Sequence, residues 1–282
     1  MFIKVAVRDF EPTTMIMLRL FIAAALLLVV LAWQRGWRRM LAEMRRLGWE
    51  GFALGVVNAA IPFTLIAWGE KHIDSGVAAI ANASMPIFVV LLAIRWKPSE
   101  RVRGQRLLGF LIGLVGVGIL AGVHPKGGWW GAAGTMAVVV ASVSYAAGTL
   151  WSQRLVEHAS GLTLAATTMT GAFVVLLPFG LWQLPSHVPG WKETGSVIAL
   201  AVIGTAVAQI LLYRVLRTDG AARVSLVTYL LPVTALFYGV VLLAEPLTWQ
   251  ELGGMVLILG GVALGSGAVR MPRREPVVAP SP

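Results

Sequence analysis

Nine apolar stretches, most of them about twenty residues long, restrict what this chain can fold into. They lie at about 13–33, 49–69, 75–95, 106–123, 129–152, 160–184, 194–216, 221–243 and 252–269. A helix rises about 1.5 Å per residue, so about 20 apolar residues cross the ~30 Å hydrocarbon core of a bilayer. Each stretch is therefore long enough, or nearly so, to span a membrane. The sequence predicts an all-α integral membrane protein with nine full spans.

Composition agrees with that fold class. Hydrophobic residues make up 57% of the chain and charged residues 13%, and the mean hydropathy is +0.79. A soluble domain of this size could not keep so much apolar surface out of water. The chain has no cysteine, which excludes a disulfide framework, a thiolate metal site and a cysteine nucleophile.

The basic residues are distributed unevenly between the loops. Of the 23 lysines and arginines, 17 follow the first, third, fifth, seventh and ninth spans. The positive-inside rule places these loops, including Arg35–Arg46, and the C-terminus in the cytoplasm of a multi-pass cell-membrane protein. This pattern accounts for the net charge of +10 without a nucleic-acid partner. The first full span then starts outside, so residues 1–10 look like the end of an incomplete first helix, and ten helices complete the topology.

The two halves of the chain resemble each other. At an offset of 145, six residues from Glu100 to Val117 match Glu245 to Val262; at an offset of 146, Ala60, Leu65 and Pro86 match Ala206, Leu211 and Pro232. A repeat with an odd number of helices enters the membrane from the opposite side in its second copy. We therefore expect an inverted five-plus-five repeat, with copies at 1–123 and 124–270 and a disordered cytoplasmic tail at 271–282.

The ionisable side chains avoid the centres of the spans. All 13 carboxylates and all four histidines lie in loops or at span ends. A proton relay through a membrane uses intramembrane Asp, Glu or His, so no buried proton carrier is expected. No metal-ligand spacing and no clustered acid–base set occurs. We expect neither a cofactor nor an enzymatic activity.

Arg19 is the one charged residue inside a span. One interpretation is a carboxylate- or anion-binding group that faces a cavity. The other is a side chain that extends to the outer interface, or pairs with Glu70 or Asp74 near the same face. The second is favoured, because Arg19 is only ~10 Å of helix from the outer end of its span.

Several polar side chains lie deep in the spans, and each either bridges helices or faces a substrate. The candidates for substrate binding are Asn58, Asn82, Tyr145, Gln209, Tyr213 and Tyr229. Asn58 shares a helical face with Pro62, and Gln209 shares one with Tyr213. Because these segments are repeat equivalents, we expect the two faces to meet near the pseudo-twofold axis. For Ser144 the bridging role is favoured.

Two further features concern kinks and interfaces. Pro86 and Pro232 are matched by the repeat, and each is either a fixed bend or a helix break at a transporter's centre. Tryptophans such as Trp33 and Trp129 are expected in the aromatic belt at the membrane interface.

Three segments carry a resemblance to a known family. They are Met15-Ile-Met-Leu-Arg19-Leu-Phe, Asp74-Ser-Gly-Val-Ala-Ala-Ile-Ala-Asn-Ala-Ser-Met-Pro86, and Tyr229-Leu-Leu-Pro232 followed by Ala244-Glu245-Pro-Leu-Thr. In their order and spacing, over essentially the whole chain, these resemble the EamA-type permeases of the drug/metabolite transporter superfamily. The resemblance implies ten helices in a five-plus-five inverted repeat and the movement of small metabolites.

The function that we expect is a secondary transporter or facilitator working by alternating access. A cavity lined by amides and phenols without fixed charge suits a zwitterionic, neutral or amphipathic metabolite. An amino acid or a related compound is the substrate that we expect, in part because the family resemblance implies it. The alternatives are a non-transporting scaffold or receptor and, less favoured, a membrane-embedded enzyme. The expected partners are the small-molecule substrate and membrane lipid, with a homodimer left open.

Overall fold

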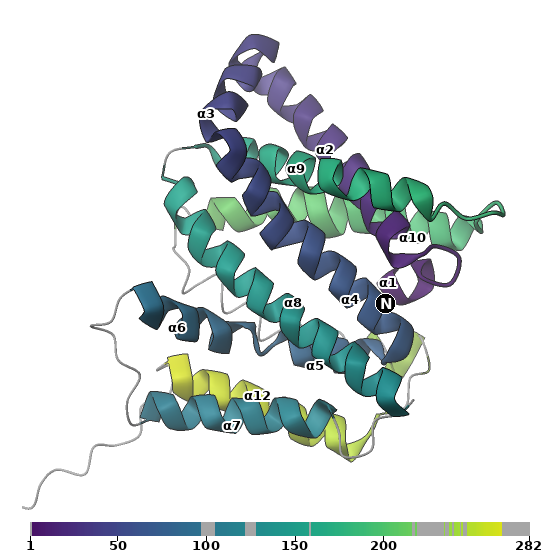
Figure 1. Ribbon diagram of the computed structural model, residues 1–282, viewed down its shortest axis with the longest axis vertical. Coiled ribbons are helices and arrows are strands. Elements are labelled where there is room, and N and C mark those ends of the chain that lie inside the picture. Colours follow the sequence, from purple (N-terminus) through teal and green to yellow (C-terminus); the bar gives the residue numbers. More distant parts are fainter. Residues whose placement is uncertain are drawn as a thin grey trace, which may run out of the picture.

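The computed structural model is a bundle of helices (Figure 1). It describes residues 2–96, 105–121, 128–157, 159–215 and 247–266, with a few isolated positions between 218 and 244. Within these ranges all regular structure is helical, which confirms the all-α prediction: α1 Phe2–Ala6, α2 Pro12–Arg35, α3 Trp37–Gly55, η1 Val56–Ala60, α4 Ile61–His72, α5 Ser75–Asn82, α6 Met85–Trp96, α7 Gln105–Ala121, α8 Gly128–Leu155, α9 Gly161–Trp182, α10 Trp191–Ala201, η2 Val202–Val207 and α12 Trp249–Ser266. A further helical segment covers residues 208–215.

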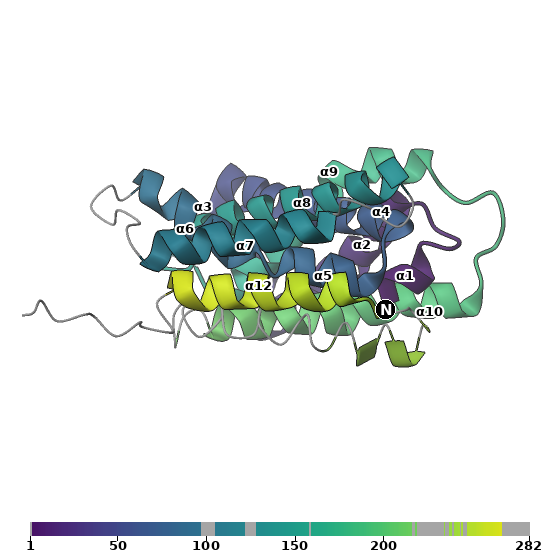
Figure 2. The ribbon, with the colours of Figure 1, turned by 90° about the horizontal axis from the view of Figure 1, so that it is seen from below.

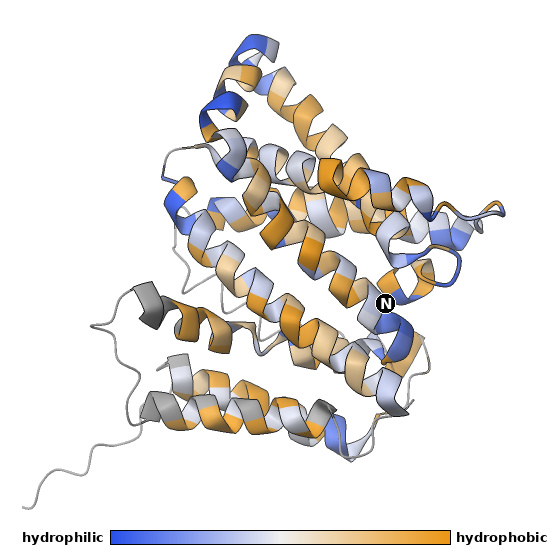
Figure 3. Ribbon diagram, viewed as in Figure 1, coloured by the Kyte–Doolittle hydropathy of each residue, from blue (hydrophilic) through white to orange (hydrophobic). Residues whose placement is uncertain are grey.

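Five stretches are long and apolar enough to cross a membrane: Pro12–Arg35, Trp37–His72, Gly128–Leu155, Gly161–Trp182 and Trp191–Val215. Ser75–Val89 and Trp249–Gly265 are shorter apolar helices. In Figure 3 the apolar residues lie along the lengths of the helices, whereas strongly hydrophilic residues gather at helix ends and turns. Five of the nine predicted spans are thus clear, and 221–243 lies outside the described ranges.

The predicted span at 75–95 is broken near its middle. Helix α5 ends at Asn82 and α6 begins at Met85, with Pro86 as its second residue. Proline lacks the N–H that a continuous helix would need there, and its ring would clash with the carbonyl one turn earlier. Ser84 closes the gap by donating a hydrogen bond to the Ala81 carbonyl at 2.6 Å. Pro86 therefore lies at a helix break, one of the two alternatives that the sequence left open, and Pro232 lies outside the described residues.

The basic segment after α2 is a helix, where the sequence predicted a loop. Gly36 (φ 76°) separates α2 from α3, and Gly48 (φ 53°) kinks α3 after three turns. Between them, Met40 and Leu47 are buried against the core. The arginines of this stretch are exposed: Arg38, Arg39, Arg45 and Arg46. Residues 37–47 therefore form an amphipathic helix of the kind that lies in a membrane interface.

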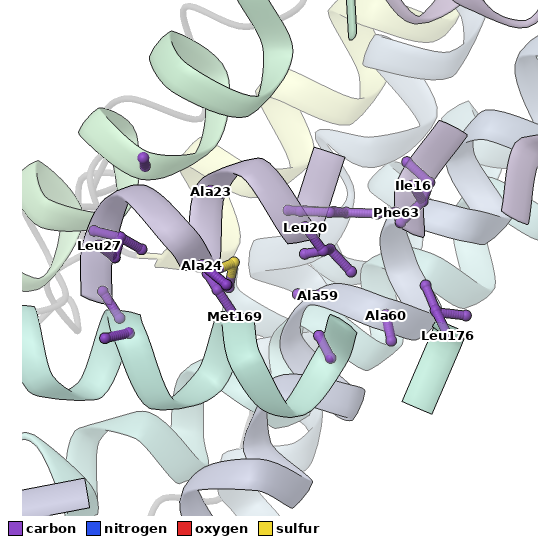
Figure 4. Packing of buried hydrophobic residues seen from close by; sticks show 14 of the residues in the cluster. Ile16, Leu20, Ala23, Ala24, Leu27, Ala59, Ala60, Phe63, Met169 and Leu176 are labelled. Atoms are coloured by element: carbon purple, nitrogen blue, oxygen red, sulfur yellow. The ribbon is translucent and has the colours of Figure 1, made fainter. Parts of the chain in front are cut away.

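The main core lies where α2 crosses α9 and α3–α4 packs against α8 and α9. Figure 4 shows the buried α2 side chains Leu20, Ala24 and Leu27 in this cluster, beside Ala59 and Met169. A Cβ at Gly55 would overlap the backbone carbonyl oxygen of Thr168. The α3–α9 crossing is therefore close enough to require a glycine, as is typical where lipid gives no hydrophobic drive to pack.

Helices α7 and α12 lie side by side and form a second, extensive contact (Figure 2). A Cβ at Gly109 would approach the Gly261 carbonyl oxygen to 2.6 Å, and one at Gly116 would approach the Gly254 carbonyl oxygen to 3.0 Å. The glycine faces of the two helices thus pack against each other. Thr248 and Glu251 cap the start of α12 reciprocally, with the Thr248 N–H donating to Glu251 at 2.9 Å.

Candidate functional site

The π-helix η1 carries Asn58. The Ile61 N–H donates to the Val56 carbonyl, five residues back, instead of four. Pro62 follows directly; in a regular helix its ring would clash with the Asn58 carbonyl and it has no N–H to donate. The wider turn is the backbone's way of accommodating this proline.

Asn58 is 5% exposed and faces helix α8. A Cβ at Gly148 of α8 would come within 2.7 Å of the Asn58 Oδ1, so only glycine leaves room for this amide. One turn earlier in α8, the Ser144 hydroxyl donates a 2.6 Å hydrogen bond to the Val57 carbonyl of η1. Ser144 thus bridges helices, the role that the sequence favoured for it.

The π-helix η2 contains no proline. The Thr205 hydroxyl donates to the Leu200 carbonyl, five residues back, at 2.8 Å. Arg19, from α2, donates from Nε to the Thr205 hydroxyl at 2.7 Å and from Nη2 to the Gly204 carbonyl at 3.4 Å. Side-chain hydrogen bonds therefore occupy backbone carbonyls in and just before this turn.

Arg19 is buried, with 6% of its surface exposed. Its guanidinium carbon lies 4.0 Å from the centroid of the Phe63 ring, and Phe63 packs on Tyr145 at 6.1 Å between ring centroids. The side chain does not extend to the outer interface, so that interpretation is wrong. The reason is tertiary: η2 and α4 supply a hydroxyl, a carbonyl and an aromatic face within reach of the guanidinium.

No ion pair within 4.0 Å is observed between Arg19 and a carboxylate of the described residues; the two that occur there are Arg35–Glu43 and Lys71–Glu11. Glu70, which is 6% exposed, contributes a longer-range electrostatic attraction to Arg19. Glu70 is thus near enough to attract Arg19, but the two side chains do not form the predicted contact ion pair.

Gln209 and Tyr213 lie one turn apart on the segment 208–215, and both are at most 8% exposed. Tyr213 faces Asn58 and Thr168. Its hydroxyl nevertheless has no partner in hydrogen-bond geometry within the described part of the chain, and the same holds for Gln209 Oε1 and Thr64 Oγ1. Buried polar atoms without partners are uncommon in folded proteins, so the face that carries Gln209 and Tyr213 is the candidate for contact with a ligand or water.

The other predicted site residues lie elsewhere. Asn82 ends α5 at the break and accepts a 3.2 Å hydrogen bond from Ser142 of α8. Tyr145 lies beside Phe63 and Arg19, and Tyr229 is outside the described residues. The structure therefore brings Asn58 and Tyr213 together, while Asn82 bridges helices. Thr205, Thr168 and the burial of Glu70 were not expected. A threonine inside an apolar stretch was the available signal for the first two, single for Thr205 and beside Thr167 for Thr168.

Two cavities are lined by described residues at the end of the bundle that carries the basic segment. The smaller, of about 290 Å³, is lined by Val30, Gln34, Gly161, Leu162, Ile210, Tyr213, Arg214 and Thr218. The larger, of about 810 Å³, is lined by residues that include Arg35, Glu43, Arg46 and Trp49. Tyr213 thus links the buried polar cluster to a cavity that reaches toward the helix ends.

A bundle of apolar helices with a broken span, irregular turns and buried polar groups is the architecture of a membrane transporter. The chain belongs to the EamA-like transporter family, which it matches over residues 1–122 and 132–267. The family resemblance of the sequence is thereby confirmed.

Individual relatives agree with this class. An uncharacterized transporter of Archaeoglobus fulgidus is 28% identical over 92% of this chain and 90% of its own length. The uncharacterized inner membrane transporter YedA of Escherichia coli is 27% identical over 99% of this chain and 89% of its own. A probable amino-acid metabolite efflux pump of Salmonella typhimurium is 25% identical over 79% and 77% of the two chains.

A solved crystal structure shares the fold, with a TM-score of 0.67 and 20% identity, covering 93% of this chain and 90% of its own. At that identity the likeness concerns the fold alone.

Proposed function

We propose that this protein is a secondary transporter or facilitator that moves an amino acid or a related metabolite by alternating access. The observation that carries the proposal is a buried face of the segment 208–215, on which Gln209 Oε1 and the Tyr213 hydroxyl have no hydrogen-bond partner among the described residues and Tyr213 faces Asn58 of η1. An unpaired polar group inside a membrane protein is costly, so a polar ligand that completes its hydrogen bonds is the natural occupant. The name of the Salmonella relative supports the substrate class.

Two observations support an inverted repeat with copies at 1–123 and 124–270. The π-helices begin at Val56 and Val202, an offset of 202 − 56 = 146, which equals the offset of the sequence matches. The glycine contacts between α7 and α12 are reciprocal as well: Gly109 meets Gly261 while Gly116 meets Gly254. Helices that are equivalent and run antiparallel give this pattern, and inverted repeats are the usual basis of alternating access.

The orientation that we propose places Arg35–Arg46 and the C-terminal tail in the cytoplasm. The amphipathic helix at 37–47 supports it, because exposed arginines beside Trp37 suit the anionic cytoplasmic leaflet. Reporter fusions after Arg46 and after Met271 should both report the cytoplasm. Reporters on opposite sides would contradict the topology.

Flux into reconstituted vesicles tests the function. The full chain is expected to accelerate exchange of one or more labelled amino acids over protein-free vesicles, with and without an imposed pH gradient. The absence of a mid-span carboxylate or histidine in the sequence leads us to expect flux without the gradient. A correctly folded protein that moves no member of the panel would favour the scaffold or receptor alternative.

A further inference from the structure

Arg19 is a buried positive charge whose contacts with the described residues are all with neutral groups. The guanidinium donates to a hydroxyl and a carbonyl of η2 and stacks on the Phe63 ring, and no described carboxylate lies within 4.0 Å of it. A charge inside a membrane span is costly, and such residues pair with an opposite charge or mark a substrate pathway. Within the described residues, the negative charge of Glu70 acts on Arg19 at longer range and not in contact.

The geometry leaves part of the guanidinium available. It has five N–H donors, and the described structure engages Nε with Thr205 and one hydrogen of Nη2 with Gly204. The Gly204 contact is long, at 3.4 Å. Nη1 donates no hydrogen bond to any described residue. The two terminal nitrogens therefore present the edge that binds a carboxylate through two parallel hydrogen bonds.

The surroundings fix this edge in place. Thr205 holds Nε from the second half of the chain, and Phe63 holds the planar face from the first half. Tyr145, half-buried on α8, lies beside both and adds a phenol. Two separate helices already fix the position of the guanidinium. It therefore loses little further conformational freedom when it binds a ligand, which favours recognition of a planar anion.

We infer that Arg19 binds the carboxylate of the transported molecule, so that the substrate class is a free carboxylic acid such as an α-amino acid. The inference rests on the proposed transport function and specifies its substrate. The alternative is a purely structural clasp, in which Arg19 only holds η2 against α2 and takes no part in choosing the substrate.

The test compares a free acid with its carboxamide and its methyl ester. Vesicles that contain the wild-type protein take up the labelled amino acid that gives the highest flux. The unlabelled acid, its amide and its ester are then added as competitors of this uptake. The acid is expected to compete at roughly 10- to 100-fold lower concentration than either analogue, as for a hydrogen-bonded charge pair. In Arg19→Gln the ratio should fall to within about twofold. Arg39→Gln, an exposed arginine of α3 that is not among the lining residues of either cavity, should keep the wild-type ratio.

Two further measurements test the assignment even if the Arg19→Gln variant folds poorly. Arg19→Lys keeps the charge but lacks the fork, and should retain a reduced preference for the acid. The thermal unfolding midpoint of detergent-solubilised wild type should rise with the acid and not with the amide.

The possible failures are distinguishable. If the wild type transports amino acids but treats acid, amide and ester alike, the carboxylate assignment is wrong while the transport function stands. An unchanged acid preference in a folded Arg19→Gln variant also overturns the assignment. If no compound of the panel is transported or stabilises the protein, the proposed function itself fails.

Discussion

The two π-helices occupy corresponding places in the halves of the chain, yet they have different physical causes. In η1 the cause is covalent and local, because Pro62 cannot continue an α-helical hydrogen-bond ladder. In η2 the cause is tertiary, because Arg19 and Thr205 occupy carbonyls in and just before the turn. The same π-helical backbone is thus produced in η1 by a proline in the helix itself. In η2 it is accompanied by a hydrogen bond between residues that are 186 positions apart in the chain.

The offset of 146 that aligns the π-helices also shows where their chemistry differs. Asn58 corresponds to Gly204, Ala59 to Thr205, and Phe63 to Gln209. In these three pairs, the polar residue of one half is aligned with an apolar or small residue of the other half. If the two halves form the proposed inverted repeat, we expect their backbones to bend alike while the different side chains bind one ligand in one orientation.

The largest difference in stability between equivalent substitutions is expected immediately before the two π-helices, where Gly55 corresponds to Ala201. Gly55→Ala would drive a methyl group into the Thr168 carbonyl at the α3–α9 crossing, and backbone cannot move aside as a flexible side chain can. We expect loss of folded, monodisperse protein after purification. Ala201→Gly should fold, with a loss near 1 kcal/mol from helix propensity. A Gly55→Ala variant with an unchanged melting temperature would contradict the close crossing.

Asn58→Leu and Gln209→Leu test the polar cluster in each half. Leucine keeps the branching of asparagine at Cγ and suits an apolar surrounding, so both variants should insert and purify normally. If the amides contact substrate, flux should fall at least tenfold with little change in thermal stability, since a buried hydrogen bond to a charged or polar ligand has this magnitude. Trp33→Leu and Trp129→Leu, which alter side chains that are 86% and 81% exposed, should leave flux unchanged. Wild-type flux with lower stability would make the two amides helix bridges instead.

Thr205→Val tests the tertiary origin of η2. Valine matches threonine in shape but removes the acceptor for Arg19 Nε and the donor to the Leu200 carbonyl. Leaving a buried charged donor unpaired should lower the free energy of unfolding by about 1–3 kcal/mol. Thr170→Val, which removes only a local hydrogen bond to the Ala166 carbonyl, should change it much less. Equal effects of the two variants, measured by thermal unfolding in one detergent, would mean that Arg19 does not hold η2.

The sequence predicted features whose cause is local and missed those whose cause is a distant partner. The break at Pro86 was predictable because proline acts on its own helix. The position of Arg19 was not, since its distance from the helix end favoured the interface, whereas its partners come from residues 63, 204 and 205. The helix at 37–47 was missed for another reason. Its arginines were read as loop charges, although Met40, Met44 and Leu47 recur at helical spacing.

The smallest expected effect concerns the anchor of η1. Ser144→Ala removes the 2.6 Å hydrogen bond to the Val57 carbonyl, but Pro62 still prevents a regular helix at this point. Interhelical hydrogen bonds within membrane proteins contribute about 0.6 kcal/mol on average. We therefore expect a loss of that size and an intact π-turn, so substrate preference should stay as in the wild type. Ser152→Ala, whose hydroxyl bonds only to the Thr149 carbonyl of its own helix, is the matched control. If Ser144→Ala alters substrate preference as strongly as Asn58→Leu, then η1 depends on its contact with α8 as η2 depends on Arg19, and the contrast between a local and a tertiary cause does not hold.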